Sequence, residues 1–346
     1  MEYFLYFAIL TLALLGMPIY SVMALFSAVA FFFAEIELSA LGIEVYKIAA
    51  SPTLLTIPLF TFAGYLMAES KSPQRLLRLA SAAIGWLPGG VAIVSLVICA
   101  FFTAFTGASG VTIIALGGLI YPMLINKNYS EDFSLGLITT SGSLGLLFPP
   151  SLPIILYGII AKVDIDKLFL AGIVPGIILI LVLSLYSISV GKKMESTPFN
   201  FQELVSALKG ARFEIPIPLM ILGGIYSGII TPTEASAISA GYVLIMVCFL
   251  YKDVSFKNDI PKIIKDSMSL VGAILLILCC ALALTNYMVD EEIPLKILDW
   301  IRSVVDNKLT FLLLLNIFLL IVGAMMDIFS AIIVVVPLIL PIAEGF

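Results

Sequence analysis

Two clusters of helix-breaking residues interrupt apolar sequence of membrane length. The first is Phe105-Thr-Gly-Ala-Ser-Gly110, and the second combines Ser141-Gly-Ser-Leu-Gly145 with Phe148-Pro-Pro-Ser151. A helix that breaks within hydrocarbon leaves backbone N–H and C=O groups unpaired, which is costly unless protein, an ion or water satisfies them. We therefore expect a chain with repeated breaks of this kind to use the freed groups to bind something, which favours transport.

The composition points to a membrane protein and excludes several other classes. Of the 346 residues 61% are hydrophobic and only 12% are charged, whereas soluble domains carry about 25% charged residues. The sequence therefore predicts an all-α polytopic membrane protein. A net charge of −5 without a basic tail argues against nucleic acid as a partner. Histidine is absent, so the commonest zinc and haem ligand and the usual general base are missing.

The remaining chemistry-bearing motifs give no sign of an enzyme or of a cofactor. No phosphate-binding G-x-x-x-x-G-K-[ST] run occurs. The four cysteines lie in apolar runs without metal-ligand spacing, so we interpret them as small core residues that hold no transition metal. They are Cys99, Cys248, Cys279 and Cys280.

A helix needs ~20 residues to cross ~30 Å of hydrocarbon. The apolar runs predict spans near 3–16, 18–34, 48–68, 131–158, 168–190, 214–230, 232–251 and 267–288. Two further stretches, 88–125 and 309–346, are too long for one crossing, and each has a break near its middle. Because the two tips are small and polar rather than charged loops, with Asp327 as the one acid in the second, we predict re-entrant helical hairpins there, with two full crossings as the alternative.

The chain also repeats its own order of segments. Leu15-Gly-Met-Pro18 resembles Ile230-Thr-Pro232 at an offset of 214, and Ile120-Tyr-Pro122 resembles Ile339-Leu-Pro341 at an offset of 219. In each half, a short amphipathic helix precedes the long broken stretch, beginning at Ser72 or at Pro294. We divide the chain into a first repeat at 1–195, an amphipathic cytoplasmic connector at 196–212, and an incomplete second repeat at 213–346.

Loop charges indicate that the two repeats have opposite orientations. The loop at 69–78 is basic and its counterpart at 290–292 is acidic, whereas 35–47 is acidic and its counterpart at 252–265 is basic. Because basic loops stay in the cytoplasm, corresponding loops face opposite sides, and the N-terminus is expected in the periplasm. Inverted repeats with interrupted helices are typical of secondary transporters.

Both breaks have a functional and a structural interpretation. At Thr106–Gly110 the ends of two half-helices would offer carbonyls to a cation and N–H groups to an anion, while close helix packing is the alternative. In the span at 131–158, the Ser-Gly run and the prolines at 149, 150 and 153 would supply ligands, and a simple proline kink is the alternative. Asp327 is an intramembrane acid, and it either belongs to a functional site or caps the helix that follows.

A further motif has a structural interpretation. The pattern Thr231-Pro-Thr-Glu234 predicts a capping box at the start of a helix.

These motifs together resemble a known family. The motifs that carry the resemblance are Gly107-Ala-Ser-Gly110, Thr140-Ser-Gly-Ser-Leu-Gly145, Phe148-Pro-Pro-Ser-Leu-Pro153, Tyr157-Gly158 and Thr231-Pro-Thr-Glu-Ala235. With these motifs, the sequence resembles the large permease subunit of tripartite ATP-independent periplasmic (TRAP) transporters. The resemblance implies an elevator-type fold of the ion transporter superfamily in the bacterial inner membrane. It implies Na⁺ as coupling ion for symport, a small organic acid as substrate (a C4-dicarboxylate or a sialic acid), and membrane lipid around the chain. The implied partners are a periplasmic solute-binding protein and a small four-helix membrane subunit.

The resemblance also assigns roles to individual positions. A first sodium site would involve Gly107, Ser109, Gly110, Ser141, Ser143 and Pro149. A second sodium site would begin at Met326 and Asp327. The substrate would lie between the two hairpin tips, against Thr106, Ala108, Gly142 and Ser151.

One departure from the family pattern concerns the second repeat. The family has a second interrupted helix, expected ~220 residues after Pro149-Pro150, and the sequence ends at Phe346 before that point. We therefore expect this sequence, as an inactive fragment or a truncated form, not to transport by itself. The alternatives to a binding-protein-dependent permease are a stand-alone sodium/organic-anion carrier, an intramembrane enzyme and a purely structural membrane scaffold. The enzyme would have only Asp327 and serines as nucleophile and base, and the scaffold would leave the broken helices unexplained.

Overall fold

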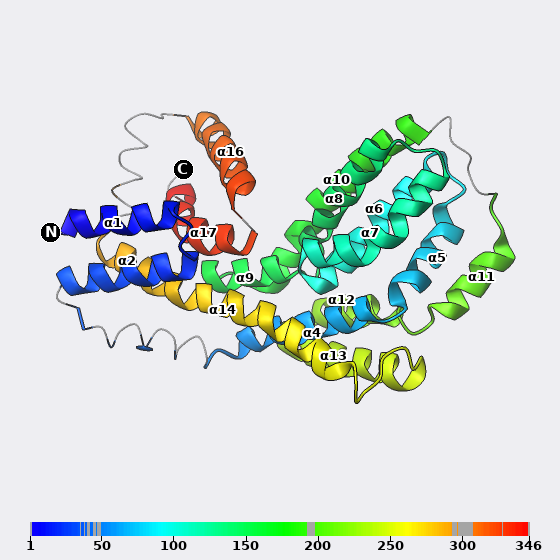
Figure 1. The fold of residues 1–346 in the computed structure, drawn as a ribbon, viewed down its shortest axis with the longest axis horizontal. Coiled ribbons are helices and arrows are strands. Elements are labelled where there is room, and N and C mark those ends of the chain that lie inside the picture. The colour runs from blue at the N-terminus through cyan, green and yellow to red at the C-terminus, as the bar shows by residue number, and fades with distance from the viewer. Residues whose placement is uncertain are drawn as a thin grey trace. The chain divides into compact units, whose positions relative to one another are not determined.

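The computed structural model describes residues 2–34, 36–37, 39, 42–43, 46, 50–191, 198–292, 296, 307–326 and 328–344. Every regular element in these ranges is helical (Figure 1), which confirms the predicted all-α class. The chain divides into two compact units, which we describe separately. One comprises residues 1–54, 156–163 and 270–346, and the other comprises 55–155 and 164–269.

Among the described residues, the first unit contains two pairs of consecutive helices. Helix α1 (Glu2–Leu14) packs against α2 (Ile19–Phe33), with the rings of Tyr6 and Phe26 stacked at 5.1 Å. Near the other end of the chain, α16 (Lys308–Met325) is followed by α17 (Ile328–Glu344), and the side chain of Asn307 caps α16 by accepting from the N–H of Leu309. The short η1 (Pro52–Leu55) leads into the second unit.

The second unit holds most of the described helices. They are α4 (Thr56–Glu69), α5 (Ser72–Ile84), α6 (Gly90–Thr106), α7 (Ser109–Asn126), α8 (Glu131–Leu144), η2 (Gly145–Leu147), α10 (Ile165–Gly191), α11 (Phe201–Gly210), α12 (Pro216–Tyr226), α13 (Pro232–Ile245) and the π-helical turn η3 (Met246–Leu250). Two helices belong to both units, α9 (Leu152–Ala161) and α14 (Ile260–Asp290).

Helix α6 forms the core of the second unit and is buried along nearly its whole length. It contacts α4, α5, α7, α8, α10 and η2. Two glycines allow the closest approaches. A Cβ on Gly64 of α4 would lie 2.5 Å from the carbonyl oxygen of Phe105, and a Cβ on Gly145 of η2 would collide with the carbonyl oxygen of Ala100. These glycines therefore fix the C-terminal half of α6 against the neighbouring backbones.

A buried charge cluster joins three segments that are far apart in the sequence. The guanidinium of Arg75 in α5 donates to Glu214 at 2.5 Å and to Asp253 at 2.7 Å. It also lies over the ring of Tyr251, whose hydroxyl donates to Glu214 at 2.7 Å. Glu214 is fully buried. The sequence predicts a cytoplasmic position for the loops at 69–78 and 252–265 and for the connector at 196–212, which lies next to Glu214. The contact between these segments is consistent with a position on the same side of the membrane. Arg75 is thus paired within the protein rather than presented to lipid headgroups.

Several helices have the length and composition of membrane spans. Among the helices that the structure describes, four qualify, at 109–126, 165–191, 232–250 and 260–288, and a fifth if the bent pair α8–η2 and α9 counts as one span. Shorter apolar helices occupy the predicted spans at 3–16, 18–34 and 214–230. The chain is therefore a polytopic membrane protein, as the sequence predicts.

The predicted repeats do not coincide with the two compact units. Helices α12 and α13, which begin the second repeat, belong to the unit that also contains α4 to α8. The division into inverted repeats stays a prediction. The predicted amphipathic helix beginning at Pro294, except Lys296, and most of the acidic loop at 35–47 lie outside the described residues.

Candidate functional site

The stretch predicted to form the first hairpin consists of two helices in contact, α6 and α7, with a short helix break between them; that it is re-entrant stays a prediction. Helix α6 ends at Thr106, and Gly107 follows with φ of +64°, a conformation that disfavours residues with a side chain. The N–H of Gly107 donates to the carbonyl of Thr103 at 2.8 Å. Ala108 is extended, and α7 begins at Ser109 without a side-chain cap. The first N–H groups of α7 therefore have no capping side chain.

The hydroxyls nearest the tip hold it together. The Thr106 and Thr112 Oγ1 atoms lie 3.0 Å apart, and both side chains are fully buried. The hydroxyl of Thr106 also lies 3.4 Å from the carbonyl oxygen of Ala108. Thr106 is thus already hydrogen-bonded within the hairpin.

The second break lies a few residues later than the Ser-Gly run suggests. Helix α8 continues through Ser141 and Ser143 to Leu144, and the chain then passes through η2 and an extended Phe148 before α9 begins at Leu152. The prolines cause the break because Pro149 and Pro150 cannot donate to a helical ladder; the peptide bond between them is cis. Helices α8 and α9 are bent by 44°. The hydroxyl of Ser151 donates to the carbonyl of Leu146 at 2.6 Å and so closes the break.

The hairpin tip and the second break contact each other. The hydroxyl of Thr103 donates to the carbonyl of Gly142 at 2.9 Å. A Cβ on Gly142 would lie 3.4 Å from the carbonyl oxygen of Ser109, and a Cβ on Gly107 would collide with the side chain of Leu152. The C-terminal ends of α6 and α8 and the N-terminal ends of α7 and α9 therefore converge in one place.

The electrostatics of this place come from the backbone. Neither 103–112 nor 141–152 contains an acidic or basic residue. The last carbonyls of a helix carry a partial negative charge, equivalent to about half an elementary charge, and the first N–H groups carry the opposite partial charge. A cation is therefore favoured beside the ends of α6 and α8, and an anion beside the beginnings of α7 and α9.

The predicted site residues differ in exposure. Gly110 and Ser143 are exposed, and Ala108 and Ser109 are half-buried. Buried are Thr106, Gly107, Ser141, Gly142, Pro149 and Ser151. Ser141 donates to the carbonyl of its own helix at Ile138, 3.1 Å away. The predicted roles of these residues in sodium or substrate binding stay predictions.

The second predicted site is described only in part. Met326 is the extended residue between α16 and α17, and its N–H donates to the carbonyl of Val322 at 2.9 Å. It belongs to the other compact unit, and Asp327 lies outside the described residues.

Sequence reasoning missed two residues that connect the breaks, Thr103 and Gly145. Thr103 lies one turn before Gly107, and its hydroxyl makes a direct hydrogen bond from α6 to α8. A threonine one turn before a helix-ending glycine was the available signal. Gly145 was included in the motif but not recognised as the contact with α6.

An exposed row of hydroxyls lies on α8 beside the second break. Thr139, Thr140 and Ser143 are all exposed, at spacings that place them on neighbouring faces of the helix. Polar groups at membrane depth are costly against lipid tails. In the membrane this face is therefore expected to meet water, a ligand or protein.

Paired helix ends inside a polytopic all-α protein are a common construction of membrane transport proteins. The chain belongs to the family described as tripartite ATP-independent periplasmic transporter, DctM component, whose model matches residues 6–346. As a member of this family it is a multi-pass protein of the bacterial inner membrane, as the sequence motifs implied.

Curated relatives agree with this assignment. The chain is 32% identical over 314 residues to the C4-dicarboxylate TRAP transporter large permease protein DctM of Pseudomonas aeruginosa, covering 90% of this chain and 73% of the relative. It is 34% identical over 293 residues to the isethionate TRAP transporter permease protein DctMQ of Oleidesulfovibrio alaskensis, covering 84% of this chain and 46% of the relative. It is 29% identical over 296 residues to the sialic acid TRAP transporter large permease protein SiaM of Vibrio cholerae, covering 85% of this chain and 69% of the relative. The chain thus spans between about half and three quarters of the length of these relatives.

Proposed function

We propose that this chain is the permease subunit of a sodium-driven importer of small organic acids. The observation that carries the proposal is the convergence of four helix ends at the α6–α7 tip and the α8–α9 break. Such a place offers carbonyls and N–H groups without a fixed side-chain charge. A cation and an anion can therefore bind side by side, as symport requires.

The cation site is supported by the two helix C-termini. The last carbonyls of α6 lack intrahelical donors. Among the described backbone groups, the N–H of Gly107 donates to one of them, the carbonyl of Thr103. Sodium is a hard cation and prefers such oxygen ligands. The hydroxyl of Ser109, half-buried at the start of α7, is the side chain best placed to add an oxygen.

The substrate site is supported by the uncapped start of α7 and by the exposed face beside it. A carboxylate would accept from the first N–H groups of α7 near Ala108 and Gly110. Ser143 and Thr140 would add hydroxyl donors from α8. Thr106 and Ser151 would instead hold the two breaks in shape, because their hydroxyls already have protein partners. The relatives named above are named for organic anions, which supports the same class of substrate.

The mechanism and the partners follow from the same proposal. A periplasmic solute-binding protein would deliver the substrate, and a small membrane subunit would complete the permease, as the description of the family as tripartite suggests. The first site lies within one compact unit, which supports an elevator mechanism, because a unit that holds its site can carry it as one body.

Sodium-specific stabilisation of the purified chain tests the cation site. A ligand at 100 times its Kd stabilises the folded state by about 2.7 kcal/mol, so NaCl should raise the unfolding midpoint above that in KCl or choline chloride at equal ionic strength. Ser109→Ala should weaken this response. Ser189→Ala should not, because the Ser189 hydroxyl is exposed on α10 and donates to the carbonyl of Leu185 in its own helix. Equal midpoints in the three salts would refute the sodium site.

The substrate class is tested through the binding protein. A thermal-shift screen of the cognate binding protein against C4-dicarboxylates, sialic acid and isethionate should identify one organic anion that stabilises it. Stabilisation only by neutral or cationic solutes would overturn the proposed substrate class while leaving the sodium result intact.

A further inference from the structure

A small pocket with both charged and aromatic walls lies between α5 and the start of α11, away from the helix breaks. Its volume is about 190 Å³, and its lining comes from two segments. These are Arg78, Ser81, Ala82 and Trp86 on one side and Pro198, Phe199, Asn200 and Glu203 on the other. All of these residues belong to one compact unit.

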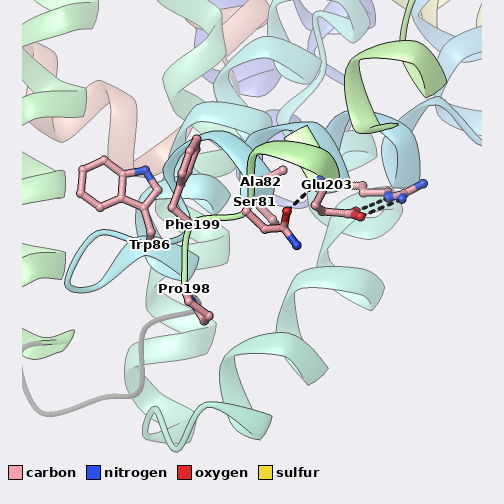
Figure 2. A pocket seen from close by; sticks show the side chains of 8 residues that line it. Ser81, Ala82, Trp86, Pro198, Phe199 and Glu203 are labelled. Atoms are coloured by element: carbon pink, nitrogen blue, oxygen red, sulfur yellow. Dashed lines mark hydrogen bonds and ion pairs between the residues drawn. The ribbon is translucent and has the colours of Figure 1, made fainter. Parts of the chain in front are cut away.

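The two ends of the pocket differ in chemistry (Figure 2). At one end the rings of Trp86 and Phe199 meet edge to face, with centroids 6.4 Å apart, and both side chains are about half exposed. At the other end Glu203 accepts from Arg78 at 2.6 Å and 3.1 Å. Ser81 and Ala82 lie between the two ends. The pocket is therefore apolar at one end and carries one positive and one negative group at the other.

The polar groups of the pocket retain capacity for a ligand. Arg78 uses Nε and Nη2 on Glu203 and on the hydroxyl of Ser206, so its Nη1 has no protein acceptor among the described residues. The buried Oγ of Ser81 also lacks a hydrogen-bond partner within the described part of the chain. A buried hydroxyl without a partner is uncommon in proteins and indicates a missing water or ligand.

The charges select the kind of ligand. Because Arg78 and Glu203 neutralise each other, the pocket has little net attraction for a simple anion or cation. A zwitterion can bind both groups at once, with its anion on the free edge of the guanidinium and its cation on the carboxylate. Since α5 is amphipathic and Trp86 is an indole at its end, the aromatic end is suited to the boundary between headgroups and acyl chains.

We propose that this pocket binds the headgroup of a zwitterionic phospholipid with a primary ammonium, a phosphatidylethanolamine. Its phosphate accepts from Arg78 and Ser81, its ammonium donates to Glu203, and the first carbons of its acyl chains pack on Trp86 and Phe199. A trimethylated ammonium cannot donate to Glu203, and a glycerol headgroup has no cation for it. Phosphatidylcholine and phosphatidylglycerol are therefore expected to bind more weakly.

Native mass spectrometry of the purified full chain tests the pocket, with the three lipids added in turn at equal acyl-chain length. We expect phosphatidylethanolamine to bind about tenfold more tightly than the other two, because one charge-assisted hydrogen bond is at stake. The double variant R78A/E203A should lose this preference. W86A/F199A should weaken the binding of all three lipids, because it removes apolar contacts rather than charges.

Matched control variants are available in the same compact unit. Asp164 and Lys167 form an exposed ion pair at 2.7 Å, so D164A/K167A removes a comparable pair elsewhere. Phe249 and Phe256 form an exposed ring pair at 6.3 Å, so F249A/F256A removes comparable aromatic surface. Both control variants should bind phosphatidylethanolamine like the original chain.

A charge-reversed variant distinguishes a loss of lipid binding from a loss of folding. R78E/E203R keeps an ion pair between α5 and α11 but exchanges the positions of the two charges, and it should bind phosphatidylethanolamine about tenfold more weakly while unfolding at the same temperature. Equal retention of the three lipids, or unchanged preference in R78A/E203A, would overturn the proposal. These outcomes are independent of sodium binding at the helix breaks.

Discussion

Replacing Gly145 by alanine tests the contact between the two helix breaks most directly. A Cβ there would collide with the carbonyl oxygen of Ala100 and lie 2.5 Å from Cβ of Thr103 and 2.6 Å from the backbone N of Ala104. Overpacking of a filled core costs about 1–3 kcal/mol. Two of the three clashing atoms belong to the backbone of α6, which cannot yield as a flexible side chain would. We therefore expect the upper end of this range, about 3 kcal/mol.

The assay is thermal unfolding of the purified chain with and without sodium. At ~2 °C per kcal/mol for a chain of this size, Gly145→Ala should lower the midpoint by about 6 °C and reduce the sodium response, because α8 is displaced from α6. Gly136→Ala is the matched control on the preceding helix α8, where an added Cβ would meet nothing within 4 Å. It should leave the midpoint unchanged or raise it, since alanine favours a helix by up to ~1 kcal/mol over glycine. Equal midpoints and equal sodium responses for both variants would refute the contact as the basis of the site.

Three further predictions concern single interactions. Thr103→Val removes the hydrogen bond to the carbonyl of Gly142 and should cost about 1 kcal/mol; an unchanged unfolding midpoint would show that the bond is unimportant. Glu214→Gln replaces the fully buried carboxylate beside Arg75 with a neutral amide, while the ion pair with Asp253 remains, and should cost about 2 kcal/mol for the weakened charge-assisted hydrogen bonds. Asp164→Asn in an exposed pair should cost under about 1 kcal/mol; equal losses in the two variants would contradict the role of burial. Burial and the Glu214 carboxylate raise the pKa of Tyr251 from its ordinary value near 10 to about 12. The folded state therefore holds this proton more tightly than the unfolded state, and the resulting stability is full below pH 10 and lost as pH rises toward 12. Tyr251→Phe should flatten the decline of the midpoint over this interval, and an identical decline in the variant would exclude Tyr251 as its source.

The breaks themselves were predictable because they depend on local chemistry. Gly107 ends α6 in a left-handed conformation, and the prolines at 149 and 150 end the helical ladder, as their residue types demand. The capping box at Thr231 and Glu234 is confirmed for the same reason, with the N–H of Thr231 donating to Glu234 at 2.8 Å. Local rules of this kind act over a few residues and can be read directly from the sequence.

What depends on distant contacts could not be predicted. The Ser-Gly run at 141–143 was expected to be part of the interruption, yet it stays helical because Gly142 fits against Ile113 and its carbonyl accepts from Thr103. The hydroxyl of Ser151 closes the break, a role that follows only from the position of Leu146. Arg75 was expected only as one of the charges of the basic loop at 69–78, and its ion-pair partners lie far away in the sequence. Packing of this kind requires the fold to be known.

The charge cluster around Arg75 has a consequence for biosynthesis. Its two acidic partners follow it by 139 and 178 residues. At ribosomal speeds of about 5–20 residues per second, both acidic partners have been synthesised on the order of ten to thirty seconds after Arg75. The early helices are therefore inserted before Arg75 can form its ion pairs with Glu214 and Asp253. Until Glu214 and Asp253 have been synthesised, the guanidinium of Arg75 depends on water for its hydrogen bonds.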